Sequence, residues 1–206
     1  EGDGPSDNAW YCQPEEVEGK IADYDDSLWT ANSPPTAAKL IQLYTDLDFP
    51  DLLGRYFGEQ ATLSVRKWVL RDVAPKNGAE SGWHQDGRFM GEDIRTVNLW
   101  LSLSECGQGT SAPGIEIVAD NSRKIYPTGT HGAPFDWTVG QGLVDELSQQ
   151  YPVVRPRFEP GDAVIFDHFN LHRTAFGLND TQHRYAVETW FFAASLAPLK
   201  QQPMLL

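Results

Sequence analysis

The stretch TVNLWLSL at residues 96–103 limits the fold most, because its apolar residues recur at every second position. Side chains of a β-strand point alternately to its two faces. One face would carry Val97, Leu99, Leu101 and Leu103. The other would carry Thr96, Asn98, Trp100 and Ser102. This second face either meets solvent, as in many antiparallel sheets, or lines the ligand cavity of a small barrel, and the alternation leaves both readings open.

Helical patterns precede the strand patterns along the chain. Residues 36–57 show apolar residues at helical spacing, with an interruption at Phe49-Pro50 and a short second helix over DLLGRYFG. We also expect a surface helix within EEVEGKIADYDDSLW (residues 15–29) and a helical insert at about 139–150. From Leu63 onward, short β-like runs are separated by turn residues.

This order favours an α+β, mainly β domain built around an antiparallel sheet or barrel. We expect one domain over residues 1–206, with a helical part at 1–60 and the core at about 61–195.

Charge and composition exclude several classes of partner. The net charge of −13 argues against nucleic acid and anionic membrane surfaces. No run of about 18 apolar residues occurs, so no membrane-spanning helix is expected. Only Cys12 and Cys106 are present, and the start of the chain lacks a secretory pattern, so we expect reduced thiols and a cytoplasmic protein. The oligomeric state stays open.

The triplet HQD within WHQDG offers two metal ligands that flank Gln85. In an extended segment His84 and Asp86 point to the same side, so both can hold one ion. The later segment GDAVIFDHFNLHRTAF supplies His168 and His172. Their spacing of four would suit a helical zinc site, but the flanking residues predict strand and turn. Either histidine would complete a 2-His-1-carboxylate set, the arrangement of non-haem Fe(II) oxygenases.

Arg184 begins the last predicted strand, RYAVETWFF, twelve residues after His172. A buried guanidinium needs an anion, and its planar fork suits a carboxylate. An acidic co-substrate would supply that carboxylate. The alternative is a surface arginine, or one paired with Glu188.

Five segments together resemble the phytanoyl-CoA dioxygenase-like family of Fe(II)/2-oxoglutarate-dependent oxygenases. In order they are WHQDG, VNLWLSL, APGIEIV, GDAVIFDHFNLHRT and HRYAVETWF, and the resemblance runs from about Ser64 to Phe192. It implies a double-stranded β-helix core (a cupin-like jelly roll) supported by N-terminal helices. It also implies a hydroxylase that uses Fe(II), 2-oxoglutarate and O2 on an unactivated C–H bond of a small organic substrate, releasing succinate and CO2.

The resemblance assigns roles to seven residues. The iron ligands would be His84, Asp86 and His172, with His172 preferred to His168 because Arg-Thr follows it. The residues that face 2-oxoglutarate would be Arg184, Thr174, Trp100 and Asn98, the first two at its distal carboxylate. Related halogenases have a small residue in place of Asp86, so its presence argues against halogenation.

Three further residues are candidates for substrate contact. Arg88 and Phe89 follow the HQD triplet, and His131 lies in the loop PTGTHGAPFDW, where an ordinary surface connection is the alternative. Strand alternation points His183 away from the pocket. The sequence has no obvious basic cluster for a CoA pyrophosphate, which favours a smaller or uncharged substrate.

Two other classes compete with the oxygenase. One is a zinc-dependent jelly-roll hydrolase or isomerase, which would not need Arg184 and Thr174 as a second carboxylate anchor. The other is a non-catalytic small-molecule-binding jelly roll, which would not need three converging metal ligands.

Overall fold

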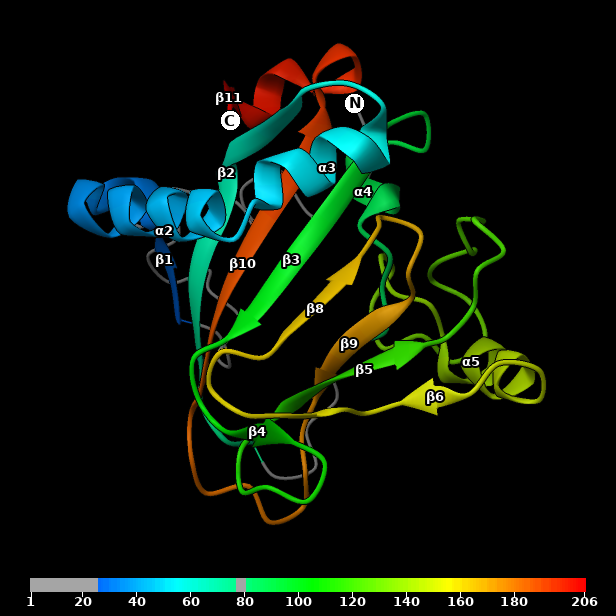
Figure 1. Cartoon of the computed structure of the whole chain (residues 1–206). Helices are drawn as coiled ribbons and strands as arrows, with labels where there is room; N and C mark the ends of the chain where they lie inside the picture. Colours follow the sequence, from blue (N-terminus) through cyan, green and yellow to red (C-terminus); the bar gives the residue numbers. More distant parts are fainter. Residues whose placement is uncertain (1–25, 77–80) are drawn as a thin grey trace.

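The computed structural model describes residues 26–76 and 81–206, and its mainly β architecture has two facing antiparallel sheets (Figure 1). The larger sheet has the order β1-β2-β10-β3-β8, with β11 paired to β2. Its strands are β1 (Asp26–Trp29), β2 (Ala61–Val73), β3 (Thr96–Ser102), β8 (Ala163–Phe166), β10 (Arg184–Ala193) and β11 (Pro203–Leu205).

The smaller sheet has the order β6-β5-β9. Its strands are β5 (Gly114–Val118), β6 (Val153–Val154) and β9 (His172–Ala175), and a separate short pair joins β4 (Cys106–Gly107) to β7 (Arg157–Phe158). The chain passes repeatedly between the sheets, from β3 to β5 and from β8 through β9 to β10. Segments from distant parts of the sequence are thereby brought face to face.

Two helices cover the outer face of the larger sheet (Figure 1). They are α2 (Pro34–Asp46) and α3 (Phe49–Phe57). The chain breaks at Leu47–Asp48, before the expected interruption, where Asp48 adopts a left-handed φ of 52°. Proline fits the first turn of a helix, so Pro50 opens α3 rather than ending α2. The other helices in the described part of the chain are α4 (Gly87–Met90), the expected insert α5 (Gln141–Ser148), and the 3-10 turns η2 (Thr30–Asn32), η3 (Ala194–Leu196) and η4 (Leu199–Gln201).

The surface helix expected within residues 15–29 does not include the last four residues of that run. Asp26–Trp29 forms β1, which pairs antiparallel with Val69–Asp72 of β2. The buried side chain of Trp29 packs on Val69. The conformation of this segment therefore depends on its pairing with the edge of the sheet, which the local sequence pattern does not reveal. The rest of that predicted helix, and Cys12, lie outside the described residues; Cys106 is a buried free thiol.

Two apolar cores lie on opposite sides of the larger sheet. The outer core joins α2 and α3 to alternate residues of β3 and β10, among them Val97, Leu99 and Phe191. The inner core lies between the sheets and includes Trp100 and Trp190. Asn98 and Trp100 are 1% and 4% exposed, so the polar face of β3 is an interior surface and the solvent-facing reading is wrong.

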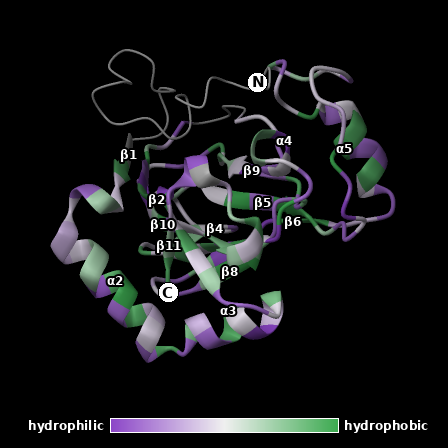
Figure 2. Cartoon of the chain, turned by 90° about the horizontal axis from the view of Figure 1, so that it is seen from above, coloured by the Kyte–Doolittle hydropathy of each residue, from purple (hydrophilic) through white to green (hydrophobic). Residues whose placement is uncertain are grey.

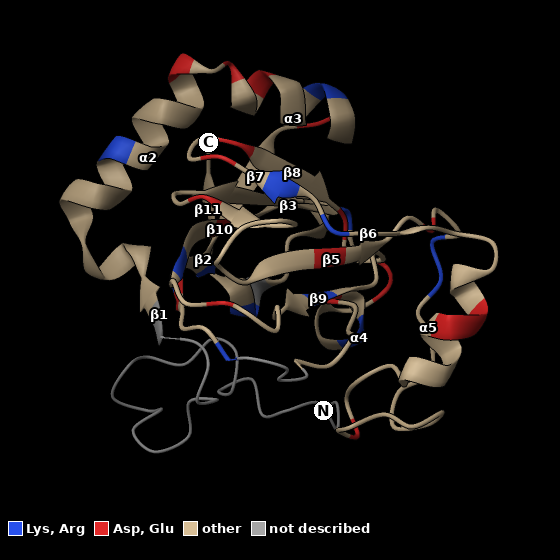
Figure 3. Ribbon diagram, turned by 90° about the horizontal axis from the view of Figure 1, so that it is seen from below, with Lys and Arg blue, Asp and Glu red and all other residues tan. Residues whose placement is uncertain are grey.

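The outer surface is mixed in character. Figure 2 shows apolar and polar residues alternating along α2 and α3. Acidic and basic residues are interspersed over these helices (Figure 3). Among the described helices, none is long and apolar enough to cross a membrane.

Tyr44 joins the helical layer to the sheet, because its hydroxyl lies 2.7 Å from Thr189 Oγ1 in a buried contact. We expect Tyr44→Phe to lower the free energy of unfolding by about 1–2 kcal/mol, since the Thr189 hydroxyl loses its partner in the core. Urea unfolding followed by circular dichroism measures this. Tyr56→Phe, at an exposed position of α3, is the control and should change stability little; equal losses in the two variants would contradict this role of the contact.

Candidate metal centre

A backbone pair across two distant segments forms the base of the centre. His84 N donates to His172 O at 2.9 Å, and His172 N donates to His84 O at 3.0 Å. This reciprocal pair is an isolated antiparallel bridge that adds the HQD segment to the edge of β9. Residues directly opposite each other in such a pair project their side chains to the same face. The two imidazole rings consequently lie with their centroids 4.4 Å apart.

Asp86 completes a group of three ligands. It stands at the turn into α4, where Gly87 N donates to His168 O at 2.9 Å. A β-carbon on Gly87 would lie 2.5 Å from Ile125 and 2.9 Å from the His168 ring, so the close turn requires glycine. Among the described residues, one ligand atom each of His84, Asp86 and His172 lies within 4.8 Å of the others, and all three residues are buried.

Hydrogen bonds set which imidazole nitrogen each histidine offers. His84 Nδ1 lies 3.3 Å from Gly82 O, and His172 Nδ1 lies 3.0 Å from Asn170 O. A carbonyl only accepts, so each Nδ1 carries the proton and each Nε2 keeps its lone pair for a metal. Asp86 Oδ2 lies 3.6 Å from His172 Nε2 and has no hydrogen-bond partner among the described residues. Two imidazole nitrogens and one carboxylate oxygen therefore converge as a metal would require.

The electrostatics of the pocket keep these groups in their ligating forms. Burial, with the neighbouring His172, lowers the pKa of His84 to about 3, so the imidazole stays neutral. Burial alone would raise the pKa of Asp86, but the Lys67 ammonium and the two histidines lower it below its usual value. The carboxylate is therefore ionised, as a metal ligand must be.

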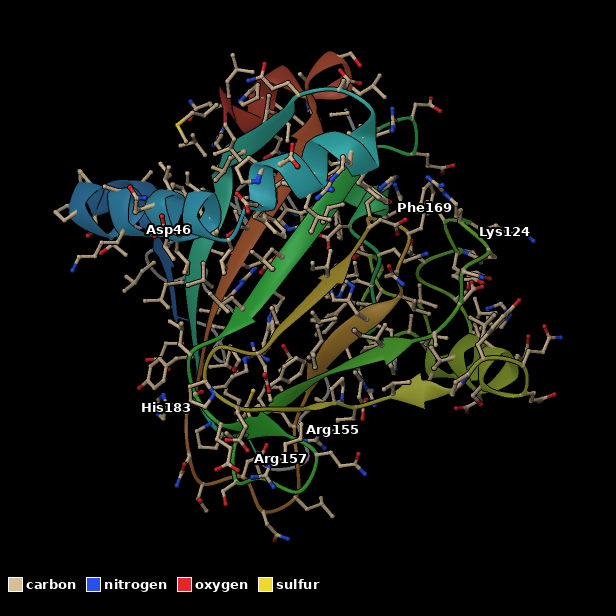
Figure 4. All side chains as sticks on the ribbon, in the orientation of Figure 1. Asp46, Lys124, Arg155, Arg157, Phe169 and His183 are labelled. Atoms are coloured by element: carbon tan, nitrogen blue, oxygen red, sulfur yellow. The ribbon has the colours of Figure 1, made fainter. Side chains whose placement is uncertain are left out.

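Gln85, between the two ligands, points to the opposite side and joins two loops. Its Nε2 donates to Lys124 O at 2.7 Å and to Phe169 O at 2.5 Å, while its Oε1 accepts from Tyr126 N at 2.7 Å. Figure 4 shows Lys124 and Phe169 on neighbouring loops at one end of the sheets. The middle residue of the triplet thus positions the segment that carries both ligands.

Arg184 lies at the far end of the space between the sheets and is 3% exposed. Its Nη1 donates to Gly114 O at 2.8 Å, and its guanidinium carbon lies 5.4 Å from the centre of the Trp100 ring. Gly114 pairs with Ala175, the neighbour of Thr174. Because Arg184 is buried, the alternative of a surface arginine is wrong. The other alternative was an ion pair with Glu188, but the two residues are four positions apart on one extended strand, a distance of about 13 Å.

Glu188 belongs to a buried polar network that the sequence pattern did not predict. Its carboxylate accepts from Arg71 Nε at 2.8 Å, from Trp190 Nε1 at 3.0 Å and from Asn98 Nδ2 at 3.3 Å. Beside it, Lys67 Nζ donates to Asp86 Oδ1 at 2.8 Å. The sequence held a signal for this network, because Lys67 and Arg71 stand on one face of β2 with Val69 between them, just as Arg184 and Glu188 share one face of β10.

The candidate substrate residues are divided between two places. The Phe89 ring lies 6.0 Å from that of Trp137, which in turn lies 5.8 Å from the His84 ring. Trp137 is thus a residue near the centre that the sequence did not single out. Arg88 is exposed on α4, and His131 is exposed with its Nδ1 2.8 Å from Thr130 Oγ1.

Like His131, His168 and His183 lie outside the group of three ligands. His168 is 1% exposed, and its Nε2 lies 3.3 Å from Glu92 O. It borders a surface cleft lined by Tyr56, Arg95, Thr96, Arg123, Asp167 and His168. His183 pairs with Asp72 at 2.6 Å at the exposed lower edge in Figure 4, turned away from the interior as expected.

No protein-family model matches the chain, and no curated protein does. The resemblance to phytanoyl-CoA dioxygenase-like proteins is therefore not confirmed by a family match. Solved structures do match. EctD from S. alaskensis, crystallised with 2-oxoglutarate and 5-hydroxyectoine, is 17% identical with a TM-score of 0.58 over 84% of this chain. This chain spans 57% of the length of EctD.

Two further solved structures match most of this chain. SnoN, a non-heme alpha ketoglutarate dependent epimerase from nogalamycin biosynthesis, is 15% identical with a TM-score of 0.58 over 83% of this chain and 63% of its own. EvdO2 from Micromonospora carbonacea var. aurantiaca is 16% identical with a TM-score of 0.55 over 91% of this chain and 71% of its own. SnoN has been crystallised with Fe3+ and alpha ketoglutarate, and EvdO2 with 2-oxoglutarate. At these identities the likeness shows that the chain shares their fold.

Gln85 provides a test of how the ligand segment is held. We expect Gln85→Leu to lower the free energy of unfolding by about 2–4 kcal/mol, because the buried Gln85 side chain loses three hydrogen bonds and leaves two carbonyls and one amide without this partner. Thermal unfolding by calorimetry measures the loss. Gln182→Leu, at an exposed position, is the matched control; a stability of Gln85→Leu equal to that of the control would contradict the proposed tether.

Proposed function

We propose that the chain is an Fe(II)- and 2-oxoglutarate-dependent oxygenase whose iron ligands are His84, Asp86 and His172. The observation that carries the proposal is the convergence of two imidazole nitrogens and one carboxylate oxygen in a buried group of three. Such a set occupies one face of an octahedral ion and leaves the opposite face open, which a structural zinc site does not do. We further propose that the two sheets form a double-stranded β-helix, supported by the passage of successive strands between them.

The distance between the centre and Arg184 suits a five-carbon dicarboxylate. Along β5, the partner of His172 is Ile117 and the partner of Ala175 is Gly114, the residue that Arg184 binds. Three residues of strand span about 10 Å. A metal–oxygen bond of about 2 Å, a carbon chain of about 6 Å and a charged hydrogen bond of about 2.8 Å add up to a similar length.

The iron, when bound, would supply the oxidative decarboxylation of 2-oxoglutarate by O2 to succinate and CO2, coupled to oxidation of a substrate C–H bond. The chain provides the surroundings for this chemistry. Arg184, with Thr174, would hold the distal carboxylate, and Trp100 and Asn98 would form the wall of the co-substrate pocket. Phe166 and Trp190 help to exclude water, since the Phe166 ring lies 4.7 Å from His172 and 6.1 Å from Trp190.

The aromatic pair Phe89 and Trp137 beside His84 is our candidate for substrate contact. Both side chains are half-buried, so a ligand can reach them. Arg88 and His131 are the outer candidates, at the exposed rim. Hydroxylation of a small organic substrate is the outcome that we propose for this site.

A comparison of two histidines tests the ligand set. His172→Ala should reduce tight Fe(II) binding by at least about 100-fold, because one of three ligands is lost. His168→Gln removes a buried histidine four residues away and should retain binding. Competition with a chromophoric chelator under anaerobic conditions gives both affinities. Tight binding by His172→Ala, with loss in His168→Gln, would move the distal ligand to His168.

The co-substrate is tested by anaerobic titration of the Fe(II) protein with 2-oxoglutarate, followed through the visible metal-to-ligand charge-transfer band. We expect Arg184→Met to weaken 2-oxoglutarate binding by about 100-fold, because charged hydrogen bonds to a carboxylate are lost. Arg173→Met removes a guanidinium from β9 that pairs with Glu116, and it should bind 2-oxoglutarate normally. If Fe(II) binds to the wild type and no band forms, the zinc hydrolase or binding-module reading replaces the oxygenase.

A further inference from the structure

The two oxygens of the Asp86 carboxylate have different surroundings. Oδ1 accepts a hydrogen bond from Lys67 Nζ at 2.8 Å, and the side chains of Lys67 and Asp86 are only 2% and 4% exposed. Oδ2 is on the side of His172 Nε2, at 3.6 Å, with no hydrogen-bond partner among the described residues. One oxygen thus binds an ammonium group while the other lies among the metal ligands.

A second contact places the ammonium of Lys67. Its strand, β2, pairs with β10, and its ammonium lies 4.6 Å from the centre of the Trp190 ring on that neighbouring strand. Water is excluded from the ion pair, so the attraction between the charges is only weakly screened. A buried ion pair adds little net stability to a core, because the cost of removing both charges from water is large and an apolar pair of similar volume often stabilises the core equally well. A function at the metal centre explains its presence better than stability does.

The number of open metal positions depends on how Asp86 binds. With one carboxylate oxygen and two imidazoles, an octahedral ion keeps three positions open. If both Asp86 oxygens chelated the ion, only two would remain. A 2-oxo acid that binds through a carboxylate and a keto oxygen takes two positions, so the first mode leaves one open and the second leaves none.

We propose that Lys67 is a positioning residue that holds Asp86 as a one-oxygen ligand and so preserves the third open position of the metal centre. The proposal rests on the proposed function, because the third position matters only where a chelating co-substrate binds. Lys67 acts through Oδ1 and needs no contact with the metal. Arg71, four residues along the same strand, pairs with Glu188 instead and provides a matched buried cation for comparison.

Counting waters on bound Mn(II) tests the proposal without turnover or co-substrate. Manganese prefers the same octahedral geometry, and broadening of its EPR signal in 17O-enriched water counts the coordinated waters. We expect three waters in the wild type and in Lys67→Arg, which keeps a charged donor. We expect two in Lys67→Met, where Asp86 is free to chelate, and three in the control Arg71→Met. Lys67→Gln is too short to reach Oδ1 in the same way and should also give two, and it serves if Lys67→Met does not fold.

The outcomes separate this proposal from the proposed function. Three waters in both Lys67→Met and Lys67→Gln would overturn the role of Lys67 while leaving the oxygenase intact. So would weaker 2-oxoglutarate binding with an unchanged water count, because Lys67 would then contact the co-substrate directly. A wild type that binds Mn(II) and Fe(II) but gives no charge-transfer band with 2-oxoglutarate would refute the proposed function instead. With two waters in Lys67→Met, we also expect 2-oxoglutarate affinity for the Fe(II) variant to fall by at least about tenfold.

Discussion

The candidate centre depends on one pair of backbone hydrogen bonds, those between His84 and His172. They join a segment that follows β2 to the first residue of β9, nearly ninety residues later in the chain. Side-chain direction then follows from strand geometry, because directly paired residues face the same way. Asp86 reaches the same space only because the chain turns at Gly87, against His168. The positions of all three side chains are consequences of this pairing and the turn that follows it.

The interior between the sheets combines an apolar core with buried charge of both signs. Asp86 and Glu188 are the carboxylates, and Lys67 and Arg71 are their partners at 2.8 Å. Burial favours the neutral form of every one of these groups, and the close opposite charges offset that cost. The pKa of Glu188 is accordingly lowered, since Arg71 and Lys67 outweigh its burial. Arg184 lies at the other end of the same space, where its guanidinium donates to the backbone oxygen of Gly114.

Local sequence patterns predicted much of the fold. They failed where the conformation of a segment depends on its pairing with a distant segment. The alternation in TVNLWLSL assigned the two faces of β3 correctly, and the helical spacing identified α2, α3 and α5. Pattern alone could not say which face of β3 is interior, because that depends on whether a second sheet covers it. Asp26–Trp29, at the end of the run in which a helix is expected, is a strand because it pairs with the edge of β2. At the site, the motif spacing pointed to His84, Asp86 and His172, but the contact between Lys67 and Asp86 joins two strands whose relative register the sequence does not show.

Gln85 has a consequence for how such a chain can diverge. All three of its partners are main-chain atoms, the carbonyls of Lys124 and Phe169 and the amide of Tyr126. These main-chain atoms are present whatever the side chain, except that a proline at position 126 would lack the amide hydrogen, so most substitutions in the two loops leave the bonds to Gln85 possible. The segment that carries His84 and Asp86 therefore keeps its position when side chains in the neighbouring loops are substituted. The residues of those loops can therefore change while the arrangement of His84 and Asp86 is kept.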